Sequence, residues 1–280
     1  MQTICVEVAR VLLYWGDLLS RRLELARFVA SIMLLTFLAT IRLSQGQEQT
    51  ITCWILTNPV DVDGKWTNHQ EWSDASEALM VAQLGNGTAY VRTKHDADYL
   101  YVLVDYVSDT VLGAGDYCTI RFDTKGDGGN APREDDYSFV LEWLTAASSS
   151  FWMRQGTGVS WGGLTGPVGG ATVKSDCKPS ADPYFAAAHM VYEFKIPLAI
   201  FASSMNSAIC VDVQDRYPSG ITMLWPTTYN TERPSTWGKL TISVSAVPIP
   251  EFNSVGIVAG IGIMSTMSLL VLNKKRLRKD

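Results

Sequence analysis

The sequence predicts an all-β domain, an antiparallel β-sandwich of the jelly-roll type, flanked by an apolar segment at each end. Short apolar or alternating runs recur through the middle of the chain, and turn-rich gaps such as DTKGDGGNAP and GTGVSWGGLTGPVGG separate them. No long helical periodicity interrupts this pattern. The two apolar segments leave about 200 residues between them, which is the size of one domain.

The N-terminal segment has the layout of a secretory signal. Basic residues, among them Arg21 and Arg22, precede the apolar run 28–41, and the small polar stretch LSQGQ follows. The run is shorter than the about 20 residues that a membrane-spanning helix needs. We therefore predict that residues 1–46 are a leader and a cleaved signal peptide. A retained N-terminal anchor is the alternative, because Arg42 directly follows the run.

Strands are expected through residues 47–245. Tyr99–Asp105 is apolar on both faces, as in a strand buried between two layers. In Tyr117–Asp123, Cys118, Ile120 and Phe122 point to one face and more polar residues to the other, which is the period of a half-buried strand. The other expected elements are strands over 88–94, 137–144, 150–154, 191–196, 208–214, 221–225 and 240–244, and a short helix after Pro197.

The C-terminal segment predicts a membrane anchor. Val255–Leu272 holds no charged residue, and five Lys and Arg residues follow it within 273–280. An apolar helix followed by a basic tail keeps that tail in the cytoplasm. We therefore expect a linker over 246–254, a transmembrane helix over 255–272, and a main domain held outside the cell, at the cell surface.

The net charge of the domain argues against one class of partner, and its cysteine content predicts disulfides. Residues 47–273 hold 13 Lys and Arg against 24 Asp and Glu, a net charge of 13 − 24 = −11. Such a balance repels phosphate backbones, so nucleic acid is not an expected partner. The exported domain keeps Cys53, Cys118, Cys177 and Cys210, and an even number outside the cell predicts up to two disulfides, with all three pairings open.

The order of short motifs resembles the carbohydrate-binding modules of family 9 over about residues 58–244. The matching motifs are Val62-Asp63-Gly64 before Glu71-Trp72, Asp96 to Val102, Asp116 to Asp123, Glu193 to Pro197, Leu224-Trp225-Pro226 and Trp237 to Leu240. The resemblance implies a sandwich that binds polysaccharide or a surface glycan without catalysis. The Gly-rich stretch 156–170 has no counterpart in the family pattern.

The residues before the C-terminal apolar run carry a second resemblance. Ile249-Pro250-Glu251-Phe252 resembles the archaeal sorting signals that begin with Pro-Glu-Phe. This resemblance implies an archaeal cell-surface protein whose tail is exchanged for a lipid.

Tryptophan is the first residue type to consider for sugar binding, because sugar rings stack their C–H faces on aromatic rings. Trp152 and Trp161 flank a Gly-rich loop, and Trp225 precedes a proline at the end of an expected strand. These three are the expected carbohydrate-binding residues. Trp72 and Trp237 lie in the entrance and exit motifs, where we expect core packing.

An acidic loop suggests a metal site. Asp123, Asp127, Asp135 and Asp136 supply the hard oxygen ligands that calcium prefers, although Lys125 breaks the spacing of an EF-hand loop. Members of the family commonly bind structural calcium, so the resemblance implies calcium at these residues. The alternative is a solvated acidic turn.

Two alternatives to carbohydrate binding are open, and enzyme activity is not expected. No Ser-His-Asp or HExxH pattern is present, and nothing singles out a carboxylate pair for glycoside hydrolysis. Related sandwiches bind haem, for which His189-Met190 is the local candidate. A structural envelope protein is the other alternative, and it should bury Trp152, Trp161 and Trp225 or pack them on a neighbour.

Overall fold

The computed structural model describes residues 49–145, 148–164, 166–201 and 206–246. Their strands are β1 (Thr50–Ile55), β2 (Ser76–Ala82), β3 (Ala89–His95), β4 (Tyr99–Tyr106), β5 (Tyr117–Asp123), β6 (Asp136–Thr145), β7 (Ser148–Gly156), β8 (Trp161–Gly163), β9 (Thr172–Lys178), β10 (His189–Pro197), β11 (Asn206–Gln214), β12 (Thr222–Trp225) and β13 (Gly238–Ala246). Three 3₁₀ turns complete them: η1 (Val168–Gly170), η2 (Leu198–Phe201) and η3 (Pro234–Thr236). The all-β prediction is confirmed, and the helix expected after Pro197 is η2.

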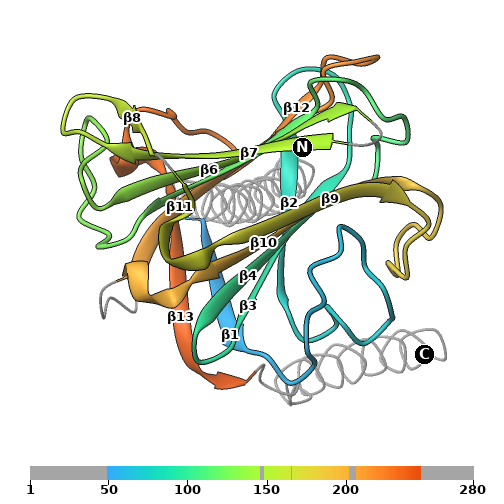
Figure 1. Ribbon diagram of the computed structural model, residues 1–280, viewed down its shortest axis with the longest axis horizontal. Helices are drawn as coiled ribbons and strands as arrows, with labels where there is room; N and C mark the ends of the chain where they lie inside the picture. Colours follow the sequence, from blue (N-terminus) through green and yellow to red (C-terminus); the bar gives the residue numbers. More distant parts are fainter. Residues whose placement is uncertain (1–48, 146–147, 165, 202–205, 247–280) are drawn as a thin grey trace, which may run out of the picture. The chain divides into compact units, whose positions relative to one another are not determined.

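The strands form a sandwich whose two layers join along one side (Figure 1). One layer runs β8-β7-β6-β5-β11-β12 and the other runs β2-β3-β4-β10-β9, with β12 hydrogen-bonded to β2. β13 pairs with β11 and with β1, and β1 pairs with β3. The pairs that β1 forms with β13 and with β3 are parallel, whereas the other pairs are antiparallel.

Strand β4 is buried on both faces, as its sequence predicts. Leu100 and Val102 belong to the main core between the layers. Tyr101 and Leu103 point the other way, into a second apolar cluster that contains Trp72. The segment between β1 and β2 supplies Trp72 and so covers the outer face of β4.

Two motifs that carry the family resemblance meet at one buried carboxylate. Glu193 Oε2 accepts hydrogen bonds from the amides of Asp63 and Gly64 at 2.8 and 2.7 Å, and its Oε1 accepts one from Trp72 Nε1 at 3.2 Å. Gly64 has φ +88°, and a Cβ there would lie 2.7 Å from the carbonyl carbon of Ser175. These residues therefore hold the segment between β1 and β2 onto the sheet.

The disulfide prediction is wrong, because all four cysteines of the domain are free. Cys53 on β1 and Cys118 on β5 lie in the main core. Cys210 on β11 stands opposite Arg121 and therefore points to the outer face. Cys177 lies on the sheet edge, on β9. The four thiols thus come from four strands: Cys53, Cys118 and Cys177 contact the main core, and Cys210 lies on the outer face.

The predicted signal peptide, linker, transmembrane helix and basic tail lie outside the described residues, apart from Ala246. Within the described part of the chain, no helix has the length and apolar character needed to cross a membrane.

Candidate functional site

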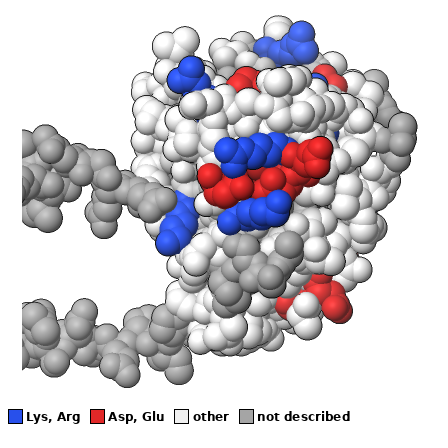
Figure 2. Space-filling model, turned by 90° about the vertical axis from the view of Figure 1, so that its left-hand side faces the viewer, with Lys and Arg blue, Asp and Glu red and all other residues white. Residues whose placement is uncertain are grey.

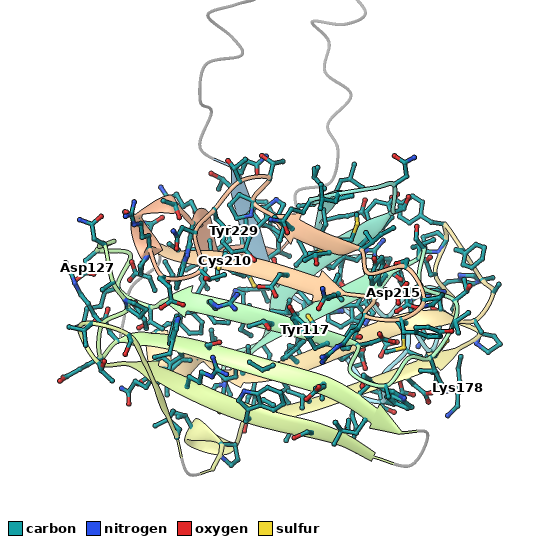
Figure 3. All side chains as sticks on the ribbon, turned by 90° about the horizontal axis from the view of Figure 1, so that it is seen from above. Tyr117, Asp127, Lys178, Cys210, Asp215 and Tyr229 are labelled. Carbon is teal, nitrogen blue, oxygen red and sulfur yellow. The ribbon has the colours of Figure 1, made fainter. Side chains whose placement is uncertain are left out.

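The outward face of β5, β6 and β7 carries a groove of about 320 Å³, which we call the outer groove. Its lining residues are Tyr117, Thr119, Arg121, Val140, Glu142, Trp152, Arg154 and Arg216. Figure 3 views the molecule onto this face, with Tyr117 near its centre. The groove is open to solvent and presents both an aromatic ring and charged groups.

Strand alternation builds the outer groove. Residues 118, 120 and 122 of β5 point into the core, as predicted, so the residues between them point outward. Antiparallel register then aligns Thr119 with Val140 and Val140 with Trp152 in one row across the three strands. Tyr117 and Glu142 form the adjacent row. Trp152 is therefore flanked by residues fixed on a rigid sheet.

The charged groups of the outer groove are mostly cationic. Arg121 forms an ion pair with Asp212, whose Oδ1 also accepts a hydrogen bond from the Tyr229 hydroxyl at 2.8 Å. Burial alone would lower the pKa of Arg121, but the charge of Asp212 raises this pKa above its ordinary value. Arg154 and Arg216 are exposed, and neither forms an ion pair with another described residue. The groove lining has three guanidinium groups and one carboxylate.

The three tryptophans predicted to bind sugar have different surroundings. Trp152 is half-buried in the outer groove. Trp161 is also half-buried, and its ring stacks on Trp237 with the centroids 6.2 Å apart and 2° between the planes. Trp225 is only 3% exposed and belongs to the main core, so the expectation that it stacks on sugar is corrected. Its place opposite Val211, on the inward face of β12, explains this burial. The predicted burial of Trp72 is confirmed.

A stacked tyrosine pair with one exposed member lies outside the sequence predictions. Tyr90 and Tyr184 stack with their ring centroids 4.7 Å apart, and Tyr184 is 54% exposed. The Tyr184 hydroxyl donates to Glu77 Oε1 at 2.9 Å, and the guanidinium carbon of Arg92 lies 5.2 and 5.5 Å from the two ring centres. No sequence motif marks this pair, because its members are 94 positions apart (184 − 90).

The structure brings together three of the four aspartates predicted to bind calcium. Asp123, Asp135 and Asp136 each offer an oxygen, and these atoms lie within 4.8 Å of one another; we call them the loop cluster. Asp127 instead pairs with Arg133 at 2.8 Å. Asp127 lies at one end of the molecule in Figure 3, and on that side acidic side chains are bracketed by basic ones (Figure 2).

The chemistry of the loop cluster fits a hard cation. Burial raises the pKa of Asp136 to about 7, and the charges of Asp123 and Asp135 contribute to the rise. Asp136 Oδ1 and Asp135 Oδ2 are buried without a hydrogen-bond partner. Asp123, in contrast, accepts hydrogen bonds from the amides of Gly126 and Gly128, at 2.7 Å each. The unpartnered oxygens are the atoms that a calcium ion would contact.

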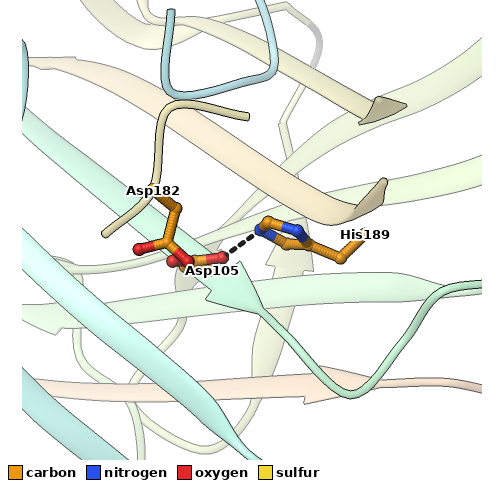
Figure 4. Close-up of side chains that lie close together, drawn as sticks. All are labelled: Asp105, Asp182 and His189. Carbon is orange, nitrogen blue, oxygen red and sulfur yellow. Dashed lines mark hydrogen bonds and ion pairs between the residues drawn. The ribbon is translucent and has the colours of Figure 1, made fainter. Parts of the chain in front are cut away.

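His189, the haem-ligand candidate, lies within a buried ion network (Figure 4). Its Nε2 lies 2.6 Å from Asp105 Oδ1 and its Nδ1 2.8 Å from the Ala187 carbonyl, so both ring nitrogens are occupied. Burial alone would lower the pKa of His189, but its hydrogen bond with Asp105 raises this pKa above the ordinary value.

The carboxylates around His189 already have a cation. Arg92 Nη1 lies 2.9 Å from Asp105 Oδ2, and Arg92 Nη2 lies 3.9 Å from Asp182 Oδ1. Arg92 also pairs with Glu77 at 2.7 Å, so three carboxylates share one guanidinium, and His189 is a second cationic partner of Asp105 when it is protonated. The ligand atoms of Asp105 and His189 therefore already have partners within the chain. The haem alternative loses its local candidate, because Met190 is also buried in the main core.

Comparison with known proteins supports the fold. No protein-family model and no curated protein matches the sequence. Among solved structures, a carbohydrate-binding module of family 9 from Caldicellulosiruptor kristjanssonii, in complex with cellotriose, has a TM-score of 0.51 and 18% identity over 72% of this chain and 100% of that chain. A family 9 module from the same organism, in complex with glucose, has a TM-score of 0.51 and 15% identity over the same shares. The chain therefore has a fold similar to that of family 9 carbohydrate-binding modules.

Proposed function

We propose that this domain binds carbohydrate without catalysis and that the outer groove is its binding site. The observation that carries the proposal is the half-buried ring of Trp152, set among guanidinium donors on the exposed face of a rigid sheet. An aromatic ring stacks on the C–H face of a sugar, and the guanidinium groups replace water on its hydroxyls. The similar modules whose structures contain cellotriose and glucose support this proposal.

The charge of the outer groove favours a saccharide that carries carboxylate groups. Residues 49–246 hold 13 Lys and Arg and 22 Asp and Glu, a net charge of 13 − 22 = −9, yet three of the 13 cations line this groove. Arg154 and Arg216 have no ion-pair partner among the described residues, and both are exposed. Arginine binds carboxylates through paired hydrogen bonds, so uronic acid units fit this lining better than neutral sugars do.

The location and the metal content of the chain belong to the same proposal. The protein is exported and is anchored by residues 255–272 at the cell surface, with the sandwich outside and the basic tail inside. The Pro-Glu-Phe sequence before the anchor is an archaeal sorting signal. Calcium binds the loop cluster through Asp123, Asp135 and Asp136 and ties the loop before β6 to the end of β5.

A structural envelope role is the second candidate. Trp225 is buried and Trp161 packs on Trp237, as a purely structural domain would require. Trp152 distinguishes the two roles, because its ring lines an open groove.

The test is a glycan array probed with the purified full chain in mild detergent, followed by calorimetry with one acidic and one neutral oligosaccharide. Trp152→Ala should abolish measurable binding, and Arg154→Gln should weaken binding of the acidic ligand and reduce its dependence on salt. Tyr184→Ala is the control, because Tyr184 is an exposed aromatic residue outside the groove. If Tyr184→Ala abolishes binding and Trp152→Ala does not, the site is the tyrosine pair; if no glycan binds, the structural role stands.

A further inference from the structure

Three buried aspartates converge at one end of the sandwich, and nothing in the sequence motifs points to them as a group. Asp109 follows β4, Asp116 directly precedes β5, and Asp215 directly follows β11. Each offers an oxygen, and these atoms lie within 4.8 Å of one another. They are 1%, 0% and 4% exposed. We call them the aspartate triad; Figure 3 shows Asp215 at the opposite end of the molecule from Asp127 of the acidic loop.

The aspartate triad lacks a counter-charge. None of the three carboxylates takes part in an ion pair with a described Lys, Arg or His residue. Asp109 Oδ2 and Asp215 Oδ1 are buried and have no hydrogen-bond partner. Burial raises the pKa of Asp109 to about 7, and the charges of Asp215 and Asp116 add to the rise. Buried carboxylates without partners are costly, so such a group requires a bound cation or bound protons.

The surrounding groups do not neutralise the triad. His189 uses both ring nitrogens on Asp105 and the Ala187 carbonyl. The Tyr106 hydroxyl donates to the Ile221 carbonyl at 3.2 Å rather than to a carboxylate. Burial raises the pKa of the Cys177 thiol to about 11 and that of the Tyr192 hydroxyl well above its ordinary value, so both are neutral at pH 7.

Backbone amides and the Ser219 hydroxyl donate hydrogen bonds that fix the three carboxylates of the triad. Asp116 Oδ2 accepts from the Gly113 amide at 2.7 Å, and its Oδ1 accepts from the Arg216 amide at 2.8 Å. Asp215 Oδ2 accepts from the Ser219 hydroxyl at 2.5 Å. Asp109 Oδ1 accepts from the Val111 amide at 3.3 Å. Donors outside the triad thus hold each aspartate in place by hydrogen bonds. Asp109 Oδ2 and Asp215 Oδ1 accept none and remain available to a ligand.

We propose that the aspartate triad is a binding site for a divalent cation of the calcium type, separate from the loop cluster. Carboxylate oxygens are the ligands of hard cations, and three of them carry enough charge to hold one. Soft metals are not favoured, since no imidazole or thiolate belongs to the group.

The site also touches the outer groove, and this part of the inference rests on the proposed function. Asp116 accepts a hydrogen bond from the backbone amide of Arg216 and directly precedes Tyr117 in the chain. Both Arg216 and Tyr117 line the groove. A cation at the triad therefore fixes one end of the groove. Its removal should weaken glycan binding without changing any residue that contacts the glycan.

The test compares thermal unfolding of the full chain in EDTA and in CaCl2 for the wild type and for Asp109→Asn. Asparagine keeps the Oδ1 acceptor for Val111 and removes one buried charge, so without a cation the variant should melt above the wild type. In CaCl2 the order should reverse, because the wild type gains stability from the bound ion and the variant loses a ligand. If Asp109→Asn melts above the wild type by the same margin in both solutions, the triad holds protons and the proposal is overturned.

Asp136 belongs to the loop cluster, which is itself proposed to bind calcium, so the control is Glu232→Gln at an exposed position outside both carboxylate groups. Glu232→Gln should melt with the wild type in both solutions. Terbium luminescence, excited through the tyrosines beside the triad, gives a second readout. It is measured in the Asp136→Asn background, which removes the loop cluster as a second terbium site, and there Asp215→Asn should abolish the remaining signal. An unchanged terbium signal in Asp215→Asn would also overturn the site. Glycan binding measured in both solutions separates the two proposals: calcium binding without any glycan binding refutes the proposed function alone, and glycan binding without calcium binding refutes this inference alone.

Discussion

Glu193→Gln tests the buried carboxylate that joins the segment between β1 and β2 to the sheet. Glu193 is fully buried, and burial raises its pKa from 4.5 to about 8. Because the folded state binds this proton more tightly than the unfolded state does, the associated stability is fully present below pH 4.5 and is lost as the pH rises through 8. Glutamine cannot titrate, so the variant should not lose this stability.

The magnitude follows from the pKa. At 1.36 kcal/mol for each pKa unit, the loss between the two pKa values totals about 5 kcal/mol, and about 3 kcal/mol of it falls between pH 6 and pH 9. The amide nitrogen of glutamine cannot accept a hydrogen bond, so either Trp72 Nε1 or the Asp63 and Gly64 amides would lose their acceptor. This loss lowers the stability of the variant by about 1–3 kcal/mol at every pH. The stability of the variant relative to the wild type should therefore improve by about 3 kcal/mol from pH 6 to pH 9.

Urea unfolding of the full chain, followed by tryptophan fluorescence at both pH values, measures this difference. Other carboxylates that titrate in this range, such as Asp109 and Asp136, are present in both proteins and cancel. Glu232→Gln, at an exposed position, should behave as the wild type at both pH values. A constant difference between Glu193→Gln and the wild type would show that Glu193 is ionised throughout, and the reasoning would be refuted.

Three further predictions concern the scaffold. Gly64→Ala should destabilise the domain by about 2–5 kcal/mol, whereas Gly158→Ala, at a similar φ of +89° with nothing within 4 Å, should cost about 1–2 kcal/mol in the same urea assay. Arg92→Leu should cost about 3–5 kcal/mol by urea unfolding, because it leaves buried carboxylates without their cation; a loss below 1 kcal/mol would contradict the ion network. A thiol titration should find the domain's four cysteines reduced in urea, with Cys177 the first to react in the native protein; a count of two or fewer would mean that disulfides exist.

The strands were predictable where the side-chain period is strong. Tyr117–Asp123 was predicted with its observed bounds, and its outward residues line the groove. Strands β1, β2, β8 and β9 were not predicted. For β2 and β9 the reason is weak burial, because Leu79 is 57% exposed and β9 is a sheet edge with little apolar content. Their place depends on pairing with distant strands, which a local pattern does not encode.

The candidate site was predictable only in part. Trp152 was identified from its position beside a Gly-rich loop and lines the groove, whereas Trp225 was chosen because it precedes a proline at a strand end, and it is buried. Which face of a strand a ring occupies depends on register, and a shift of one residue exchanges the two faces. The arginines of the groove come from β5, β7 and the segment after β11, so their convergence is a property of the sheet order and not of any motif.

The acidic residues of the domain are not all on its surface, as the composition alone would suggest. Of the 22 acidic residues in 49–246, 11 are buried, so much of the negative charge is not a surface property. Four of the 11 have a cationic partner, namely Asp74, Asp105, Asp182 and Asp212.

The remaining 11 − 4 = 7 have none among the described residues, and their positions are not scattered. Glu71 and Glu193 each accept hydrogen bonds from two backbone amides of the segment between β1 and β2. The other five belong to the aspartate triad or to the loop cluster, the two groups in which buried carboxylate oxygens lack any partner. The buried carboxylates that have no cationic partner are thus concentrated at the two sites where a divalent cation would balance their charge. Binding of such ions would offset the free-energy cost of burying these carboxylates and would stabilise the sandwich at both ends.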